Sequence, residues 1–447
     1  MWALMSTVGS NPTPSAVWAS KYAARALTEI ANTGEVSERV AAADVPIAVA
    51  PPPGNPRFPL FDGLRAIAAL GVLVSHVGAV THPSPSFLGD LQAQLAIGVT
   101  IFFVISGFLL YRPFVAADIS GGREPTMRRF WRRRVLRIIP AYWVALTVLA
   151  FLQPLPAVFS SDWWKYYLLL QNNFGLSFNN SGIGQAWTLS VEVTFYLLLP
   201  FYAIALRRLG GTAANRRLAV EFVVLGLLAL GSIGFRHQIL NIIGAGFQGN
   251  SAANGFAKSY YDFFPDFGAL LTLPVYLAWF AVGMGFAVIS AAGHVPGSIG
   301  SKLSAVLGRS PNGLWLLSIV GFAAVLAFDR PLRLGEGSWH HVLVLAVVAP
   351  LVAPAVFAHK GGQRGVPKRV LSLRWLAWLG LVSYGIYLWH GSVTIMVMKT
   401  GLVPAGHGFI VALVVVCALT AAVAAASYYL VEKPILRFKE PRRKVQT

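Results

Sequence analysis

Ten long apolar segments, separated by shorter polar stretches, dominate the chain from residue 61 onward. They lie at about residues 61–80, 93–111, 136–153, 187–206, 218–235, 267–290, 313–328, 340–358, 375–398 and 407–431. Each segment is close to the length of about 20 residues that an α-helix needs to cross the hydrocarbon core of a bilayer. The pattern therefore predicts an all-α integral membrane protein, with a bundle of about ten transmembrane helices in residues 58–436.

The segments that flank and connect this bundle have a different composition. Residues 1–57 are rich in Ala, Ser and Pro and end in PPPGNPRFP, which would stop any helix, so we expect a flexible N-terminal tail. A continuous apolar run before Phe58 is missing, and we therefore expect no cleavable signal peptide. Gln238 to Phe267 is predicted to be a long outer loop, and residues 437–447 a basic C-terminal tail.

The composition agrees with a multi-pass membrane protein. The 447 residues are 56% hydrophobic and 12% charged, against roughly 25% charged residues in an average soluble domain. Cys417 is the sole cysteine, which excludes a disulfide framework and a cysteine-based metal site. The net charge of +19 raises the question of a nucleic-acid partner.

The positions of the cationic residues answer that question. If the N-terminus is cytoplasmic, 29 of the 36 Lys and Arg residues fall in the tails and inner loops, six fall on the outer side, and Arg65 lies within the first segment. This distribution obeys the positive-inside rule and predicts that both termini are cytoplasmic. It also explains the charge through contact with membrane lipids, without nucleic acid.

The first apolar segment, FDGLRAIAALGVLVSHV at residues 61–77, contains an acid, a cation and an imidazole. At about 100° per residue, Arg65 and His76 point within roughly 20° of each other, with Asp62 within about 60°. A rise of about 1.5 Å per residue places His76 roughly 16 Å deeper than Arg65. Taken singly, Asp62 also fits a helix N-cap, Arg65 a cation that snorkels to headgroups, and His76 a packing histidine. Their shared stripe favours a cavity or pathway, which intramembrane ionisable groups usually face.

Arginine residues gather at the inner end of the third segment, in RRFWRRRVLRIIPAYW at residues 128–143. Arg129, Arg133 and Arg137 follow at spacings of four, and Arg134 precedes Arg137 by three, so they cluster on adjacent faces of one helix. Membrane topology and anionic lipids account for such a cluster without chemistry. Guanidinium groups also match phosphate oxygens, so the cluster is a candidate docking site for a phosphorylated cytosolic ligand.

The fourth segment opens with QAWTLSVEVTFYLLLP, in which helical spacing places Gln185, Glu192 and Tyr196 on one face. A buried glutamate needs a cationic partner or a proton, so structural pairing is one interpretation and a cavity wall is the other.

The ninth segment, LVSYGIYLWHGS, places Ser383, Tyr387 and His390 within about 60° of arc. An aromatic belt accounts for its tyrosines and tryptophan, but less easily for His390.

The sequence also argues against several common kinds of catalytic and metal site. Ser75 and His76 are adjacent on a helix and do not face each other, which excludes a serine nucleophile with its base. The chain lacks P-loop, GxSxG and HExxH motifs, and the nine histidines suggest no metal site. In the second segment, Ser106 and Gly107 are predicted to allow close helix approach.

Taken together, these motifs resemble membrane acyltransferase family three, the bacterial cell-envelope O-acyltransferases. The matching motifs, in chain order, are FDGLRAIAAL with the Arg65 and His76 pair, FFVISGF at 102–108, RRRVLRIIPAYW at 132–143, WTLSVEVTFYLLLP at 187–200, SYGIYLWH at 383–390 and VEKP at 431–434. The resemblance implies a cytoplasmic acyl-CoA donor, most simply acetyl-CoA, and a hydroxyl acceptor on a lipid, glycan or small molecule. The sequence ends at Thr447 without the extracytoplasmic hydrolase-like domain that some members carry, which leaves the acceptor class open.

The resemblance and the polar stripes suggest one mechanism as a hypothesis. Coenzyme A phosphates bind the cytoplasmic arginines, with Arg65, Arg133 and Arg137 as the best candidates, and the pantetheine arm extends toward His76. Neutral His76 acts as general base on the acceptor hydroxyl, while Asp62 tunes Arg65 or orients the site. The residues expected to line the substrate cavity or hold its helices are Trp187, Glu192, Tyr196, Ser383, Tyr387 and His390. A secondary transporter, or a flippase for an acylated lipid, is the alternative, because transporters also bury acids, bases and arginines.

Overall fold

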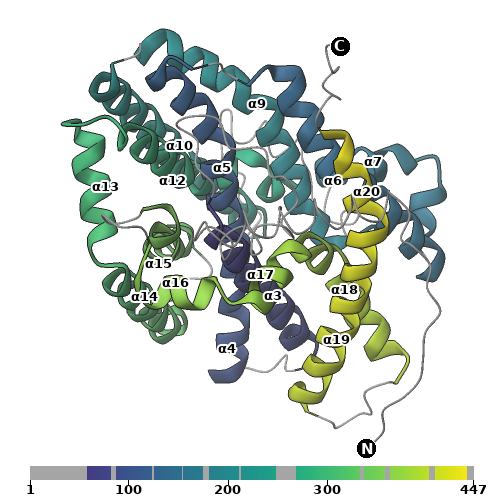
Figure 1. Cartoon of the computed structure of the whole chain (residues 1–447). Helices are drawn as coiled ribbons and strands as arrows, with labels where there is room; N and C mark the ends of the chain where they lie inside the picture. Colours follow the sequence, from purple (N-terminus) through teal and green to yellow (C-terminus); the bar gives the residue numbers. More distant parts are fainter. Residues whose placement is uncertain are drawn as a thin grey trace, which may run out of the picture. The chain divides into compact units, whose positions relative to one another are not determined.

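The computed structural model describes residues 58–81, 87–122, 125–153, 155–174, 181–210, 213–247, 268–332, 337–357, 363–401 and 408–439. The predicted N-terminal tail, and residues 440–447 of the predicted C-terminal tail, lie outside these ranges. The described residues form helices and turns, without a strand among them. This confirms the predicted all-α class (Figure 1).

The helices follow one another along the chain in a simple order. Their bounds are α3 Leu60–Thr81, α4 Phe87–Gln94, α5 Gly98–Ser120, α6 Met127–Leu152, α7 Trp163–Tyr167, α9 Trp187–Gly210, α10 Ala214–Phe247, α12 Leu273–Ala292, α13 Ile299–Arg309, α14 Pro311–Leu332, α15 Ser338–Val356, α16 Gly365–Leu371, α17 Arg374–Leu381, α18 Ser383–Lys399, α19 Phe409–Ser427 and α20 Lys433–Leu436. Short 3₁₀ turns connect several of them, and a π-helical turn at Tyr428–Glu432 joins α19 to α20.

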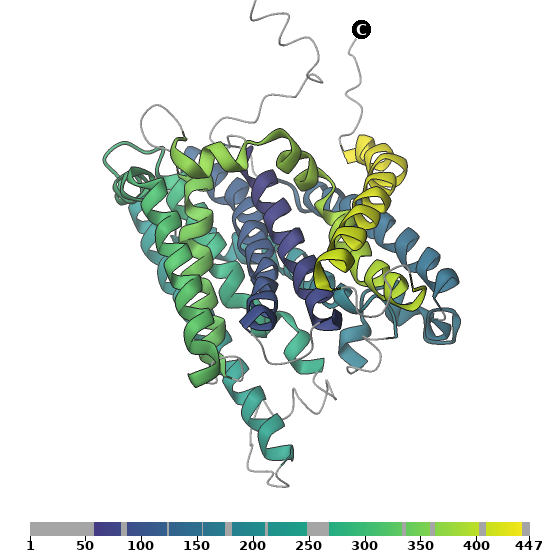
Figure 2. The same cartoon turned by 90° about the horizontal axis from the view of Figure 1, so that it is seen from below.

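The ten predicted spans all correspond to helices. Within the described residues, nine helices or continuous helical segments are long and apolar enough to cross a membrane, and the pair α17 and α18 supplies a tenth span if it is counted as one. In Figure 2 several of the long helices run in roughly the same direction, with α19 beside α18. This is the arrangement expected when each helix satisfies its own backbone hydrogen bonds inside a bilayer.

One prediction about these segments was wrong, and the ninth span has a bend that the sequence did not predict. Residues 238–247, which we predicted to belong to an outer loop, continue helix α10 to Phe247, because the sequence QILNII contains no helix breaker. The ninth span is not straight, since α17 and α18 meet at an angle of 72°. The hydroxyl of Ser383 donates a hydrogen bond of 2.8 Å to the carbonyl oxygen of Gly380, which satisfies one carbonyl exposed at that break.

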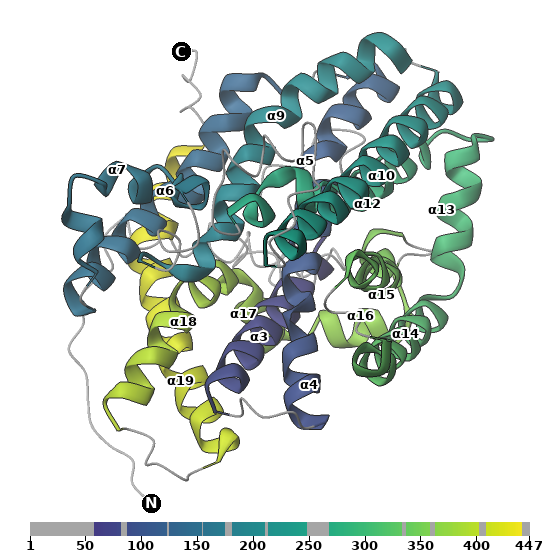
Figure 3. The same cartoon turned by 180° about the vertical axis from the view of Figure 1, so that it is seen from behind.

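Helix α3 contacts many of the other elements. It packs against α5, α17, α18 and α4, and Figure 3 shows it between α18 and α4. A side chain at Gly380 of α17 would overlap the backbone of Asp62. Small residues at such positions let helix backbones approach closely, which is a main source of packing energy in a membrane.

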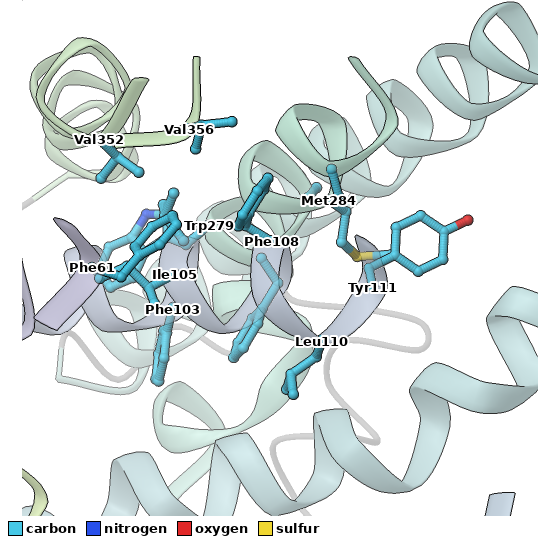
Figure 4. Close-up of a cluster of buried hydrophobic side chains, with 14 of the residues drawn as sticks. Phe61, Phe103, Ile105, Phe108, Leu110, Tyr111, Trp279, Met284, Val352 and Val356 are labelled. Carbon is cyan, nitrogen blue, oxygen red and sulfur yellow. The ribbon is translucent and has the colours of Figure 1, made fainter. Parts of the chain in front are cut away.

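A buried aromatic cluster joins α3, α5, α12 and α15. Figure 4 shows the side chains that meet there, with Phe103 and Phe108 contributed by α5. The rings of Phe61 and Phe108 stack with centroids 5.2 Å apart, and those of Phe103 and Phe280 stack at 4.6 Å. These contacts pack the aromatic side chains of the second span against α3 and α12, although Phe102 and Phe103 also line the cavity described below.

A buried ionic network lies between α5, α9 and α10, and the sequence did not reveal it. The guanidinium of Arg217 lies 2.8 Å from a carboxylate oxygen of Glu221 and 3.2 Å from one of Asp118. The hydroxyls of Tyr111 and Tyr202 also donate to Glu221. Arg217 precedes the predicted fifth span at 218–235 and so counts among the inner-loop cations, but its side chain is 0% exposed. The network pairs charges that would be costly to bury alone.

The closest approach of α5 to α12 generates a testable prediction. Gly283 faces the carbonyl oxygen of Val104, so that a methyl group there would overlap the backbone of α5. We expect Gly283→Ala to lower the free energy of unfolding by about 1–3 kcal/mol, because α5 and α12 would have to separate. Thermal unfolding of the purified protein in detergent measures the effect.

The matched control is Gly285→Ala, two residues further along the same helix. The nearest atom to a methyl group at Gly285 is a ring carbon of Phe222 at 4.0 Å, so both variants gain the same helix propensity and only the first creates an overlap. Equal melting temperatures for the two variants would contradict the packing argument.

Candidate active site

A cavity that leaves about 90 Å³ for the centres of water-sized molecules lies among α3, α5, α6, α9 and α18. Of the residues predicted from the sequence, those that line it are Arg65, Arg134, Arg137, Glu192, Tyr196, Ser383 and Tyr387. The polar stripes of the first, third, fourth and ninth spans therefore converge, although they are far apart in the sequence.

One part of the cavity wall carries three guanidinium groups. Arg65 comes from the second turn of α3, and Arg134 and Arg137 come from α6, one turn apart. Arg65 also donates a hydrogen bond of 2.8 Å to a carboxylate oxygen of Asp62, three residues earlier in α3. Asp62 lies inside the first turn of α3 rather than at its N-cap. The Asp62 carboxylate therefore meets Arg65 and does not contact His76.

Glu192 of α9 lies in the wall near these arginines. Its carboxylate accepts a hydrogen bond of 2.5 Å from the hydroxyl of Ser106 and another from the hydroxyl of Tyr196. Arg134 and Arg137 are close enough to act on its charge. The glutamate is thus both paired and part of the cavity wall, so the two interpretations of its position are compatible.

The wall formed by α18 centres on Tyr387. Its hydroxyl lies 2.8 Å from the hydroxyl of Thr188 and donates a bond of 3.2 Å to the carbonyl oxygen of Gln185. The ring of Tyr387 lies 5.7 Å from that of Phe102 and 5.6 Å from that of His390. Tyr387 is 6% exposed, so it does not belong to an aromatic belt at the membrane surface. Its ring links the cavity wall to a pair of histidines.

His76 and His390 form that pair. Nδ1 of His76 lies 2.6 Å from Nε2 of His390, although the two residues are 314 positions apart in the sequence. His390 is fully buried, whereas His76 is exposed at the protein surface. His76 is not among the residues that line the cavity. Arg65 and His76 therefore share one helix, as predicted, but the first lies in the cavity and the second lies beside it, next to His390.

Three other predicted residues lie outside the cavity wall. Arg129 is exposed and Arg133 is half-buried near the start of α6. The α6 cations that line the cavity are Arg134 and Arg137. Trp187 packs its ring against Tyr276, with centroids 5.1 Å apart. Helical spacing placed all of these residues on plausible faces, but it could not fix how α6 and α9 are rotated within the bundle.

Sequence reasoning missed several residues of the site. Ser106 was assigned to helix packing, but its hydroxyl binds Glu192, whereas Gly107 does face the backbone of Phe280 as expected. Tyr384 was assigned to an aromatic belt, but it lines the cavity and donates a hydrogen bond of 2.9 Å to the carbonyl oxygen of Ile138. A hydroxyl within an apolar helix was the available signal in both cases. Within the described ranges, no three His, Cys, Asp or Glu side chains gather as a potential metal site.

Comparison with known proteins gives a consistent result. A family model described as an acyltransferase domain matches residues 59–429. The peptidoglycan O-acetyltransferase OatA of Listeria monocytogenes is 26% identical over 396 residues, which cover 84% of this chain and 55% of that protein. The putative peptidoglycan O-acetyltransferase YrhL of Bacillus subtilis is 25% identical over 399 residues, covering 85% and 55%. The O-acetyltransferase OatA of Staphylococcus aureus is 26% identical over 408 residues, covering 85% and 58%.

The chain spans little more than half the length of these relatives. No solved structure shows a significant match to it. The family match covers most of the chain and includes every helix that borders the cavity. The chain therefore belongs to membrane acyltransferase family three and is a multi-pass bacterial membrane protein.

Proposed function

We propose that this protein is a membrane-embedded O-acyltransferase that moves an acyl group from cytoplasmic acyl-CoA to a hydroxyl group of the cell envelope. The main support for the proposal is the cavity. Three arginines line it, and the ring of Tyr387 in its wall lies beside His390, the partner of His76. An anionic donor and a base are the two requirements of acyl transfer from a phosphorylated carrier to an alcohol. Family membership supports the same reaction class.

The donor binds through its phosphate groups. Arg65, Arg134 and Arg137 offer guanidinium groups, which form charge-assisted and often bidentate hydrogen bonds with phosphate oxygens. With both termini in the cytoplasm, as the charge distribution predicts, these arginines face the compartment that contains acyl-CoA. The pantetheine arm then extends through the narrow cavity toward Tyr387, and the bulkier nucleotide stays at its mouth.

The transfer itself requires one base. The acceptor oxygen attacks the thioester carbonyl carbon, and the imidazole of His76 accepts the proton of the hydroxyl group. The tetrahedral intermediate then collapses, the carbon–sulfur bond breaks, and the leaving coenzyme A thiolate takes up the proton that His76 accepted, which returns His76 to its neutral form. The products are an ester and free coenzyme A. Because His76 is exposed at the protein surface, a large acceptor can reach it without entering the cavity.

The names of the relatives narrow the acceptor and the acyl group. Two of them are described as peptidoglycan O-acetyltransferases, one as putative, and a third as an O-acetyltransferase. We infer that the acyl group here is acetyl and that the acceptor is a hydroxyl of an envelope glycan, with a lipid or a small molecule as the remaining classes. No metal takes part in this scheme.

One observation favours a transporter instead. The 72° bend between α17 and α18 resembles the broken helices that line substrate sites in secondary transporters. A transporter or a flippase would bind its substrate at the same cavity but would consume no acyl-CoA.

The first test compares His76→Ala with the native protein in membranes supplied with labelled acetyl-CoA. We expect acyl transfer to fall by about 10²–10⁴-fold, which is the usual contribution of a general base. His237→Ala is the control, because His237 is an exposed imidazole on a different membrane helix, α10. Full transfer by the His76 variant would refute the base. Movement of a solute or lipid without consumption of acyl-CoA would support the transporter.

The second test concerns donor binding and uses neighbouring arginines of α6. Arg134 lines the cavity, whereas Arg132 is exposed. Arg134→Ala should raise the KM for acetyl-CoA by about tenfold or more, since a hydrogen bond to a charged group contributes about 1.5–3 kcal/mol. Arg132→Ala removes the same charge from the same helix and should leave KM nearly unchanged. An equal rise in both variants would indicate diffuse attraction rather than a site.

A further inference from the structure

The contact between His76 and His390 is a hydrogen bond in the plane of both rings. The ring centroids lie 4.8 Å apart and the planes are within 6° of parallel. Nδ1 of His76 and Nε2 of His390 are 2.6 Å apart. Subtracting this from the distance between centroids leaves, for each ring, about the distance from its centroid to one of its own atoms. The nitrogens therefore lie close to the line between the centroids, and the rings meet edge to edge. The N–H bond and the lone pair of an imidazole both lie in its plane, so this geometry suits a strong hydrogen bond.

The backbone of α18 fixes the proton positions on His390. Its Nδ1 lies 2.7 Å from the carbonyl oxygen of Tyr387 and 3.1 Å from that of Ile386. Carbonyl oxygens only accept hydrogen bonds, so Nδ1 must carry a hydrogen. His390 is fully buried, and the uncharged imidazole, with a single N–H group, is the form that costs less to bury. Nε2 of His390 therefore holds a lone pair.

The state of His390 determines the state of His76. Because Nε2 of His390 can only accept, Nδ1 of His76 must donate the hydrogen of their shared bond. A neutral His76 then has its lone pair on Nε2, the ring nitrogen that this bond leaves available. We propose that His390 is a positioning residue, which holds His76 in the single tautomer whose Nε2 can accept a proton from an acceptor hydroxyl.

This inference rests on the proposed function and adds a specific part to it. His390 was expected to line the substrate cavity or to hold its helices, but it is not among the residues that line the cavity, and in this inference it acts through His76. Such outer partners commonly set the tautomer and orientation of a functional histidine. The arrangement also explains why the ninth span carries a histidine inside otherwise apolar sequence.

A second layer of contacts binds other carbonyl groups of the same part of α18. The amide of Gln185 donates a hydrogen bond of 2.9 Å to the carbonyl oxygen of Leu388, and the hydroxyl of Thr394 donates one of 2.8 Å to that of His390. Gly391 packs closely on the side chain of Gln185. This part of α18 is thus held by the 3₁₀ turn Gly184–Ala186, which leads directly into α9, a helix of the cavity wall.

The test compares His390→Leu with His390→Gln. Leucine removes the acceptor, and we expect acetyl transfer to fall by about 10–100-fold, the usual cost of losing an outer-shell partner. Glutamine offers an amide oxygen near the position of Nε2, and it should restore most of the transfer. Thermal unfolding of both variants shows whether each is folded. If the leucine variant kept native transfer, or if the folded glutamine variant lost as much as the leucine variant, the positioning role would be wrong.

A second readout does not depend on activity. In protein labelled with ¹⁵N-histidine and reconstituted in lipid, the signals of His76 are assigned by their loss in His76→Ala. We expect a protonated Nδ1 and an unprotonated Nε2 in the native protein and in His390→Gln, and a shift toward protonated Nε2 in His390→Leu. An unprotonated Nδ1 in the native protein would overturn the inference. This result stands whether or not acyl-CoA is the donor, so failure of the proposed function and failure of the positioning role can be told apart.

Discussion

The structure depends on one constraint, which is that a polar group inside an apolar bundle needs a partner on a neighbouring helix. Unpaired polar groups cost several kcal/mol in hydrocarbon. Glu192 of α9 meets Ser106 of α5, and His76 of α3 meets His390 of α18. Tyr387 of α18 bonds to Thr188 of α9. Each bond fixes the rotation of two helices about their axes, which the hydrophobic contacts alone would leave free. The polar groups that give the site its chemistry therefore also set its geometry.

Close helix packing makes these bonds possible. Gly283 lets α12 lie against the backbone of α5, and Gly380 lets α17 lie against the start of α3. The second contact brings the break at Val382 next to Asp62 and the turn that carries Arg65. Because α18 leaves this break at a steep angle, it can return along α3 and present His390 to His76. A straight ninth span starting at α17 would carry His390 in a different direction.

The sequence predicted much of the fold because hydropathy reports directly on membrane spans, and it placed Arg65 and His76 on one face because helical periodicity is regular. It could not distinguish Arg133 from Arg134 as a cavity residue, since that depends on the rotation of α6 against its neighbours. Nor could it pair His76 with His390, because helix spacing carries no information about a partner 314 residues away. The bend of the ninth span was also missed, because Ser383 is compatible with a continuous helix and only its bond to Gly380 reveals the break.

The spacing of the two functional positions on α3 limits which donors suit the proposed reaction. Arg65 and His76 belong to one unbroken helix, so about 16 Å separates them along its axis, and neither can approach the other without disrupting the helix. A compact donor such as an acyl phosphate has its phosphate beside its acyl carbonyl and cannot reach both positions. Coenzyme A carries its phosphates and its thioester at opposite ends of the flexible pantetheine arm. In the proposed reaction, with an anion site at one end of a rigid helix and a base near the other, a long carrier that lies along α3 therefore suits the transfer better than a compact one.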